Sequence, residues 1–173
     1  MEDSPASQVL APQVGAGGRG AGHVGLPAVV LTLGVLGALL LVAAEFTTIA
    51  RVEIPGRTCR EVADLSAADR CELSGFERHG GALLLLGALA VLMAVGAARR
   101  GSRRAGLALI TVATLVLGMA LLRDLPEAGR TGAIGITYEG ADGRAGAGLF
   151  IEIAGGLLLA LAGALTLVGR PRT

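Results

Sequence analysis

The chain of 173 residues has a mean hydropathy of +0.67, and 53% of its residues are hydrophobic, which is typical of membrane proteins. Its net charge of +1 gives no indication of nucleic-acid binding, so we expect no nucleic-acid partner. The 28 Gly and the absence of Lys are typical of a GC-rich bacterial genome.

The first 25 residues contain the glycine-rich stretch GAGGRGAG. No strand is expected before this stretch and no Lys-Ser or Lys-Thr pair follows it, which excludes a P-loop. We expect residues 1–25 to form a disordered cytoplasmic tail.

Four apolar segments are long enough to cross the ~30 Å hydrocarbon core of a bilayer as helices of about 20 residues. They are residues 26–46, 80–98, 105–122 and 148–169. None alternates apolar and polar residues as a barrel strand does. The sequence therefore predicts an all-α membrane protein with a four-helix transmembrane bundle over residues 26–169, followed by a cytoplasmic tail at 170–173.

The first apolar segment has a second interpretation as a signal peptide, because Val42-Ala43-Ala44 would suit cleavage. Its apolar run over residues 26–46 is longer than the ~7–15 residues of a secretory signal. This length favours an uncleaved helix.

The placement of Arg predicts the orientation. The turn ARRGSRR puts four Arg between the second and third spans without an acid, and Arg170 and Arg172 follow the last span. The Arg of loops 47–79 and 123–147 are interleaved with acids. We therefore expect a multi-pass protein of the cell membrane with both termini in the cytoplasm and these two loops outside.

The first outer loop contains the only two cysteines, Cys59 and Cys71. Disulfides persist outside the cytoplasm. The spacing is not the C-x-x-C of a redox motif, and two cysteines alone make a poor zinc site. A structural disulfide is the favoured interpretation, and free cysteines or pairing with a partner protein are the alternatives.

Two outer segments have the periodicity of strands. Apolar residues alternate over Thr48–Ile54, and again in AIGITYEG at residues 133–140, which a turn at residues 140–143 ends. The two strands could pair into a short β-ribbon within a disulfide-braced cap. Ser66–Asp69 and Ser74–Glu77 resemble helix starts with an acid at the third position.

The last span carries one internal acid, Glu152, which lies about 6 Å below the outer surface at 1.5 Å per residue. Because glycines on the same helix face allow another helix to approach closely, we expect Glu152 to face protein. These helix-packing residues are Gly148, Gly155, Gly156 and Gly163.

Glu152 has two interpretations. Intramembrane acids are candidate functional residues, but the shallow depth favours an interfacial pair with Arg123 at the end of the third span. If Glu45 at the end of the first span joins them, the three residues form a polar cluster.

The layout resembles that of claudins, which also have a cytoplasmic N-terminus, four spans and a disulfide in the first outer loop. The claudin W…GLW…C…C signature is missing, because the chain has no Trp. The stretch SGFERHGGALLLLGALAVLMAVGAARRGSRRAGLALI and the helix that follows it resemble the tryptophan-associated transmembrane protein family of small bacterial four-span proteins. That resemblance implies no known activity.

Catalytic patterns are missing from the sequence: His23 and His79 stand alone, and we find no Ser/His/Asp constellation and no metal-ligand spacing. We therefore expect no cofactor and no metal, and an enzyme ranks last. The first function class is a non-catalytic integral membrane protein, an interaction or accessory subunit that uses its outer loops. The second is a small oligomeric channel or carrier with Glu152 in the path. Expected partners are the lipid bilayer and either a membrane protein or further copies of the chain.

Overall fold

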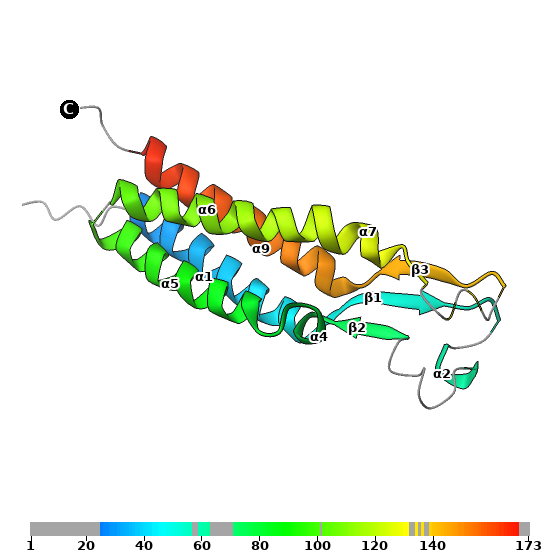
Figure 1. Ribbon diagram of the computed structural model, residues 1–173. Coiled ribbons are helices and arrows are strands. Elements are labelled where there is room, and N and C mark those ends of the chain that lie inside the picture. Colours follow the sequence, from blue (N-terminus) through cyan, green and yellow to red (C-terminus); the bar gives the residue numbers. More distant parts are fainter. Residues whose placement is uncertain are drawn as a thin grey trace, which may run out of the picture.

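Four long helices form a bundle, and a small sheet continues from one of its ends (Figure 1). The computed structural model describes residues 25–56, 59–62, 71–100, 102–131, 134, 136 and 139–169. We call the end of the bundle that carries the sheet the sheet end and the opposite one the far end. The predicted tails, except for Gly25, lie outside the described residues.

All four predicted helices are long and apolar enough to cross a membrane, which confirms the helical part of the predicted fold. The helices are α1 (Leu26–Glu45), α5 (Ala82–Arg100), α6 (Arg103–Met119) and α9 (Ala147–Val168). Helix α9 packs against α1 and α6, and α5 packs against α1 and α6.

The third helix continues beyond its predicted end at Leu122. A π-helical turn, η1 (Ala120–Asp124), follows α6 and leads into the short helix α7 (Leu125–Ala128). Pro126 does not interrupt this continuation, because it lies in the first turn of α7, where a residue without an N–H is tolerated. The wider hydrogen bond from the Leu125 N–H to the Ala120 carbonyl oxygen closes the π-helical turn just before it.

The glycines of α9 lie where neighbouring helices approach most closely. A Cβ atom on Gly155 would lie 3.0 Å from the Gly37 carbonyl oxygen of α1, and one on Gly163 would lie 2.7 Å from a side-chain carbon of Ile110 in α6. Gly156 likewise meets Leu117 of α6, and Gly148 meets Thr47 just after α1. Close backbone approach of this kind is the usual basis of helix packing in membranes.

The sheet has three antiparallel strands in the order β2 (Glu72–Ser74), β1 (Thr48–Glu53), β3 (Asp142–Ala145). The predicted strand at Thr48–Ile54 is confirmed, but the second predicted strand is wrong. Ile134 and Ile136 have helical backbone, and β3 forms instead where a turn was expected. Ile134 is buried beside the two cysteines, so its packing there outweighs the local strand periodicity.

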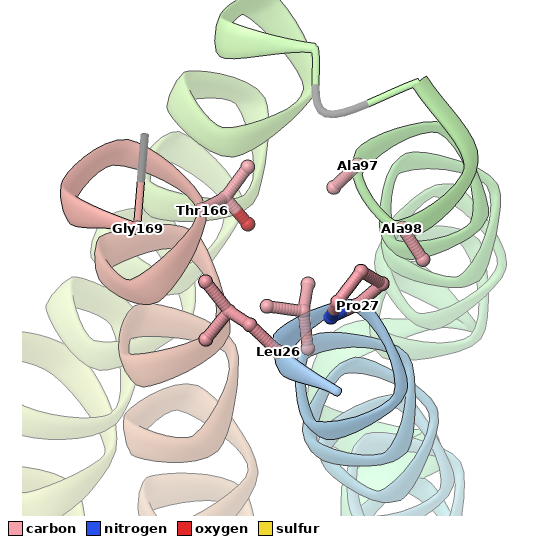
Figure 2. Close-up of a pocket in the computed structure, with 7 residues that line it drawn as sticks. Leu26, Pro27, Ala97, Ala98, Thr166 and Gly169 are labelled. Carbon is pink, nitrogen blue, oxygen red and sulfur yellow. The ribbon is translucent and has the colours of Figure 1, made fainter. Parts of the chain in front are cut away.

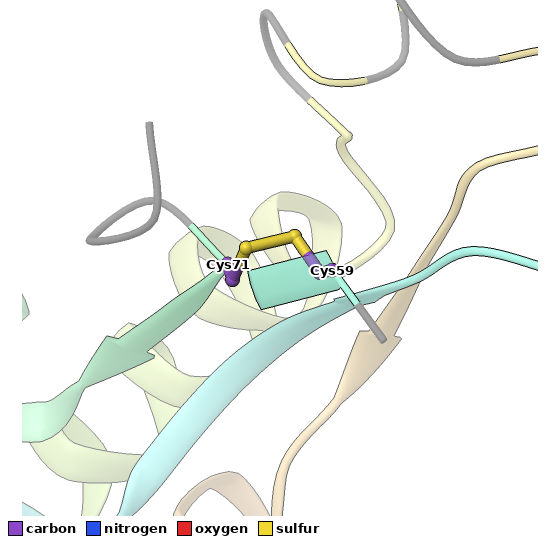
Figure 3. The surroundings of a disulfide bond; sticks show 2 residues. All are labelled: Cys59 and Cys71. Atoms are coloured by element: carbon purple, nitrogen blue, oxygen red, sulfur yellow. A yellow bond between two sulfur atoms is a disulfide. The ribbon is translucent and has the colours of Figure 1, made fainter. Parts of the chain in front are cut away.

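A disulfide joins Cys59, in the short helix α2 (Cys59–Val62), to Cys71, the residue just before β2 (Figure 3). Both cysteines are buried, and Val52 and Ile54 of the β1 segment pack against them. The Val52 N–H also donates to the Cys71 carbonyl oxygen at 2.9 Å. The predicted disulfide is therefore confirmed, and it attaches α2 to the sheet.

One of the two predicted helix starts is confirmed at Ser74, which begins α4 (Gly75–His79). The Ser74 hydroxyl accepts from the Glu77 N–H at 3.3 Å, and the Glu77 carboxylate accepts from the Ser74 N–H at 2.8 Å. The Ser74 hydroxyl also donates to this carboxylate at 2.7 Å. The hydrogen bonds from the Ser74 N–H and hydroxyl to the carboxylate lower the pKa of Glu77. The other predicted start, Ser66–Asp69, lies outside the described residues.

Candidate functional site: a buried polar cluster at the sheet end

Charged side chains from four segments of the chain meet at the sheet end of the bundle. They are Glu45 of α1, Arg78 and His79 of α4, Asp124 of η1 and Glu152 of α9. We call these five residues the polar cluster. The three acids are at most 1% exposed, so their interactions replace those with water.

Glu45 holds the end of α1 to the start of α5. Its carboxylate accepts hydrogen bonds from the N–H of Gly81 at 2.6 Å and from the N–H of Leu83 at 3.1 Å. The first N–H groups of a helix have no partner within the helix and carry partial positive charge, so a carboxylate is favourable there.

The π-helical turn separates the environments of Arg123 and Asp124. Val116 lies on the buried face of α6, and in an unbroken α-helix Arg123 and Asp124, seven and eight positions later, would both continue that face. A π-helical turn holds an additional residue, which rotates Arg123 off this face. Arg123 is exposed, whereas Asp124 is buried.

Arg78 connects α4 to the π-helical turn. Its Nε donates to Asp124 Oδ1 at 2.8 Å, and its Nη2 donates to the Arg123 carbonyl oxygen at 3.3 Å. The first contact is an ion pair with a fully buried carboxylate, and charge-assisted hydrogen bonds of this kind are the stronger ones in proteins.

The His79 imidazole lies between two carboxylates. Its Nε2 is 3.6 Å from Asp124 Oδ2 and 3.7 Å from Glu152 Oε2, and the side chain is 2% exposed. Both distances exceed the 2.7–3.2 Å typical of an N–H···O hydrogen bond. Among the described residues, His79 Nε2, Asp124 Oδ2 and both Glu152 carboxylate oxygens are buried without a hydrogen-bond partner.

Burial disfavours the protonated form of His79, but the nearby carboxylates outweigh it. Glu152 at close range, and the charges of Asp124, Glu152 and Glu45, together raise the pKa of His79 above its ordinary value. The cluster is therefore a region of strong negative potential that attracts positive charge.

The cluster predicted from the sequence consists of Glu45, Arg123 and Glu152, and the structure brings only its two acids together. Both acids belong to the polar cluster, whereas Arg123 is exposed and contributes its backbone carbonyl oxygen to Arg78. Sequence reasoning missed Arg78, His79 and Asp124. The helix start at Ser74 was a usable signal for the first two, because it predicts a helical turn that ends in Arg78-His79 above the second span.

The far end of the bundle has a different character. A groove of about 250 Å³ lies there between α1, α5 and α9 (Figure 2). Leu26, Pro27 and Ala97 are among its lining residues, and the Thr166 hydroxyl donates to the Ala162 carbonyl oxygen of its own helix at 2.8 Å. The described lining residues thus offer apolar contacts and no titratable side chain.

The sheet presents a second polar surface, which consists of Arg51 and Glu53 on β1 and Asp142 and Arg144 on β3. We call it the outer face of the sheet. Arg51 lies opposite Arg144, and Glu53 lies opposite Asp142. Glu53 forms ion pairs with Arg51 at 2.8 Å and with Arg144 at 3.1 Å. All four side chains are more than a third exposed, so these pairs order the surface and contribute little stability.

Comparison of the chain with protein-family models, curated proteins and solved structures finds no match. The polar cluster and the outer face of the sheet are therefore the features that bear on function.

Proposed function

We propose that this is a non-catalytic protein of the cell membrane that crosses the bilayer four times, with both termini in the cytoplasm, and serves as an interaction or accessory subunit. The sheet, α2 and the disulfide form an extracytoplasmic cap. The outer face of the sheet contacts the water-exposed part of a membrane-protein partner.

The observation that carries this proposal is the rigid attachment of the sheet to the bundle. Each strand adjoins a helix: β1 follows α1, β2 leads into α4, and β3 precedes α9. The Gly75 N–H donates to the Thr47 carbonyl oxygen at 3.0 Å, and the Gly146 N–H donates to the Ile49 carbonyl oxygen at 2.7 Å. A surface held this firmly loses little conformational entropy when it binds, which favours recognition.

The chemistry of the outer face of the sheet indicates the kind of partner. Four ordered charges of both signs are suited to a polar protein surface and not to lipid tails. Leu122 and Leu125, on either side of Asp124, are 83% and 48% exposed, which is typical of residues that face lipid. The sheet continues the bundle past this level, so its outer face is available to the part of a neighbouring membrane protein that faces water.

A channel or carrier with Glu152 in the path is the second candidate, and the burial of Glu152 with two unpartnered oxygens favours it. The packing of the bundle counts against it. Between the polar cluster and the far end, Gly155 and Gly163 bring α9 into close contact with α1 and α6. Thr166 is the remaining buried polar side chain among the described residues, and it bonds to its own helix. A polar route from Glu152 through one copy is therefore disfavoured.

Site-specific photo-crosslinking in intact cells tests the proposal. A photoreactive residue replaces Arg51 or Asp142 on the outer face of the sheet, and in a matched control it replaces Leu85, which is 75% exposed on α5. We expect the two sheet positions to yield one discrete protein adduct and the Leu85 position to yield none of that size. An adduct between two copies of the chain would support the oligomeric alternative, and no adduct from either sheet position would contradict the proposal.

A further inference from the structure

We propose that His79, Asp124 and Glu152 bind a divalent transition-metal ion, with Zn²⁺ as the expected species. The three side chains come from α4, η1 and α9, and one donor atom of each lies within 4.8 Å of the other two. The ion would hold these segments together at the sheet end. This role is separate from the contact proposed for the outer face of the sheet.

The distances between donor atoms fit a shared ion better than direct hydrogen bonds. His79 Nε2 is 3.6 Å from Asp124 Oδ2 and 3.7 Å from Glu152 Oε2. Zinc binds histidine nitrogen and carboxylate oxygen at about 2.0–2.2 Å, so two donors of a tetrahedral site lie about 3.4 Å apart. Small side-chain movements bring all three donors to that spacing.

The unpartnered atoms are the atoms that a metal ion would use. His79 Nε2, Asp124 Oδ2 and both Glu152 oxygens are buried and have no hydrogen-bond partner among the described residues. Buried polar atoms are nearly always satisfied, and each exception requires an explanation. A single ion coordinated by the imidazole, one Asp124 oxygen and one or both Glu152 oxygens satisfies the whole group.

The surrounding contacts orient these ligands. Asp124 uses its other oxygen, Oδ1, to accept from Arg78 Nε at 2.8 Å, which leaves Oδ2 directed at His79. Hydrogen-bonded carboxylates of this kind are usual around protein metal sites. Glu45 differs, because both of its oxygens already accept from the start of α5, so it contributes charge and not a ligand bond.

The charge of the cluster supports a divalent ion. Its three carboxylates and the Arg78 guanidinium leave two negative charges when His79 is neutral, as a metal ligand must be. Burying uncompensated charge is costly, and an ion of charge +2 would neutralise the cluster.

The donor set also selects the class of metal. Mg²⁺ and Ca²⁺ prefer oxygen ligands only, whereas an imidazole combined with carboxylates is suited to Zn²⁺, Fe²⁺ or Mn²⁺. All donor atoms are shielded from solvent, and binding through both Glu152 oxygens would complete a four-coordinate site, as a closed structural zinc site requires.

Metal binding is tested on the full chain, purified in detergent with an affinity tag that contains no histidine. The protein is stripped with a chelator, reloaded with Zn²⁺ or Co²⁺, and analysed for bound metal per chain. We expect one ion per chain, visible absorption from bound Co²⁺, and no displacement by Mg²⁺ at equal concentration.

Matched variants locate the ion. His79→Gln and Glu152→Gln should each weaken Zn²⁺ binding by at least about tenfold, because they remove a direct ligand and even the loss of an outer contact costs that much. His23→Gln, which changes the other histidine, and Glu53→Gln, which changes an exposed acid, should bind as the unaltered protein does.

Two results would overturn the site: no stoichiometric metal in the reloaded protein, or unchanged metal binding in both His79→Gln and Glu152→Gln. If the variants do not fold, the unaltered protein decides. Zn²⁺ must then raise its thermal unfolding temperature and the chelator must lower it, because a ligand that binds only the folded state stabilises it. An unchanged temperature would show that the three side chains share protons and not a metal.

Discussion

The two ends of the bundle join the same helices by different means. At the sheet end, Glu45 and Asp124 connect helices through directional contacts with backbone N–H groups and with Arg78. At the far end, contacts such as those around Leu26 and Ala97 are apolar and surround an open groove. Apolar contacts tolerate small shifts, whereas buried polar groups must meet their partners. We infer that the directional contacts of the sheet end contribute more to the choice of neighbouring helices than the apolar contacts around the groove.

Asp124→Ala is expected to give the largest effect. It leaves Arg78 without its buried counter-charge, and breaking such a pair costs about 3–5 kcal/mol of unfolding free energy. Thr166→Val at the far end keeps the volume and should change stability by less than about 1 kcal/mol, because the hydroxyl bonds to its own helix. Thermal and denaturant unfolding in detergent measure both, and equal losses would show that the two ends do not differ.

Loss of the disulfide comes next. Cys59→Ser combined with Cys71→Ser should lower the stability of the sheet by about 3 kcal/mol, the value for closing a loop of this length. Because the bundle does not contain the disulfide, its hydrogen exchange should remain slow while exchange in β1 and β2 accelerates. Faster exchange throughout the helices would show that the sheet and the bundle unfold as one unit.

Gly75→Ala should destabilise the sheet end by about 1–3 kcal/mol, since overpacking forces the backbone to move. Its Cβ would lie 2.7 Å from Glu45 Cα. Gly118→Ala is the matched control in the middle of the bundle, where a Cβ meets nothing within 4 Å. That change should be neutral or stabilise the protein by up to about 1 kcal/mol, as Ala is the better helix former. Thermal unfolding measures both variants, and an equal decrease in their melting temperatures would contradict this assignment of close contacts.

The smallest effect is expected at the cap of α4. Ser74→Ala removes one side of the capping box and should cost about 1 kcal/mol. Because the folded-state pKa of Glu77 is lowered, its contribution is present above its ordinary value of 4.5 and is lost as pH falls through the folded-state pKa. The difference in melting temperature between the unaltered protein and Ser74→Ala should therefore become smaller in acid. A constant difference down to low pH would exclude a role for the Glu77 carboxylate.

Features set by local sequence were predictable, and features set by long-range contacts were not. The strand at Thr48–Glu53 and the helix start at Ser74 follow from alternation and capping within a few residues. Strand β3 forms at Asp142–Ala145 because β1 lies beside it, and its own residues, DGRA, give no strand pattern. Segments far apart in sequence had to be placed in space before this pairing could be found.

The candidate site followed the same rule. Glu45 and Glu152 were identified because an acid in or beside an apolar span is conspicuous. Asp124 was missed because Arg123, at the end of the third span, was the expected partner of Glu152, and the π-helical turn that exposes Arg123 could not be foreseen from the sequence. His79 lies outside every apolar span, so its burial depends on the reversal of the chain at Gly80 and Gly81, which adopt φ of 61° and 92°.

The π-helical turn has a consequence for how this protein could have evolved. Such a turn differs from an α-helical one by a single additional residue, so one codon inserted into an ancestral gene is sufficient to create it. That event would turn a basic side chain outward while an acidic one stays inside, and the helix before the turn keeps its place. Loss of one codon between Ala120 and Leu122 would return the basic side chain to the buried face. A small insertion or deletion here therefore changes the charge of the interior without altering either charged residue.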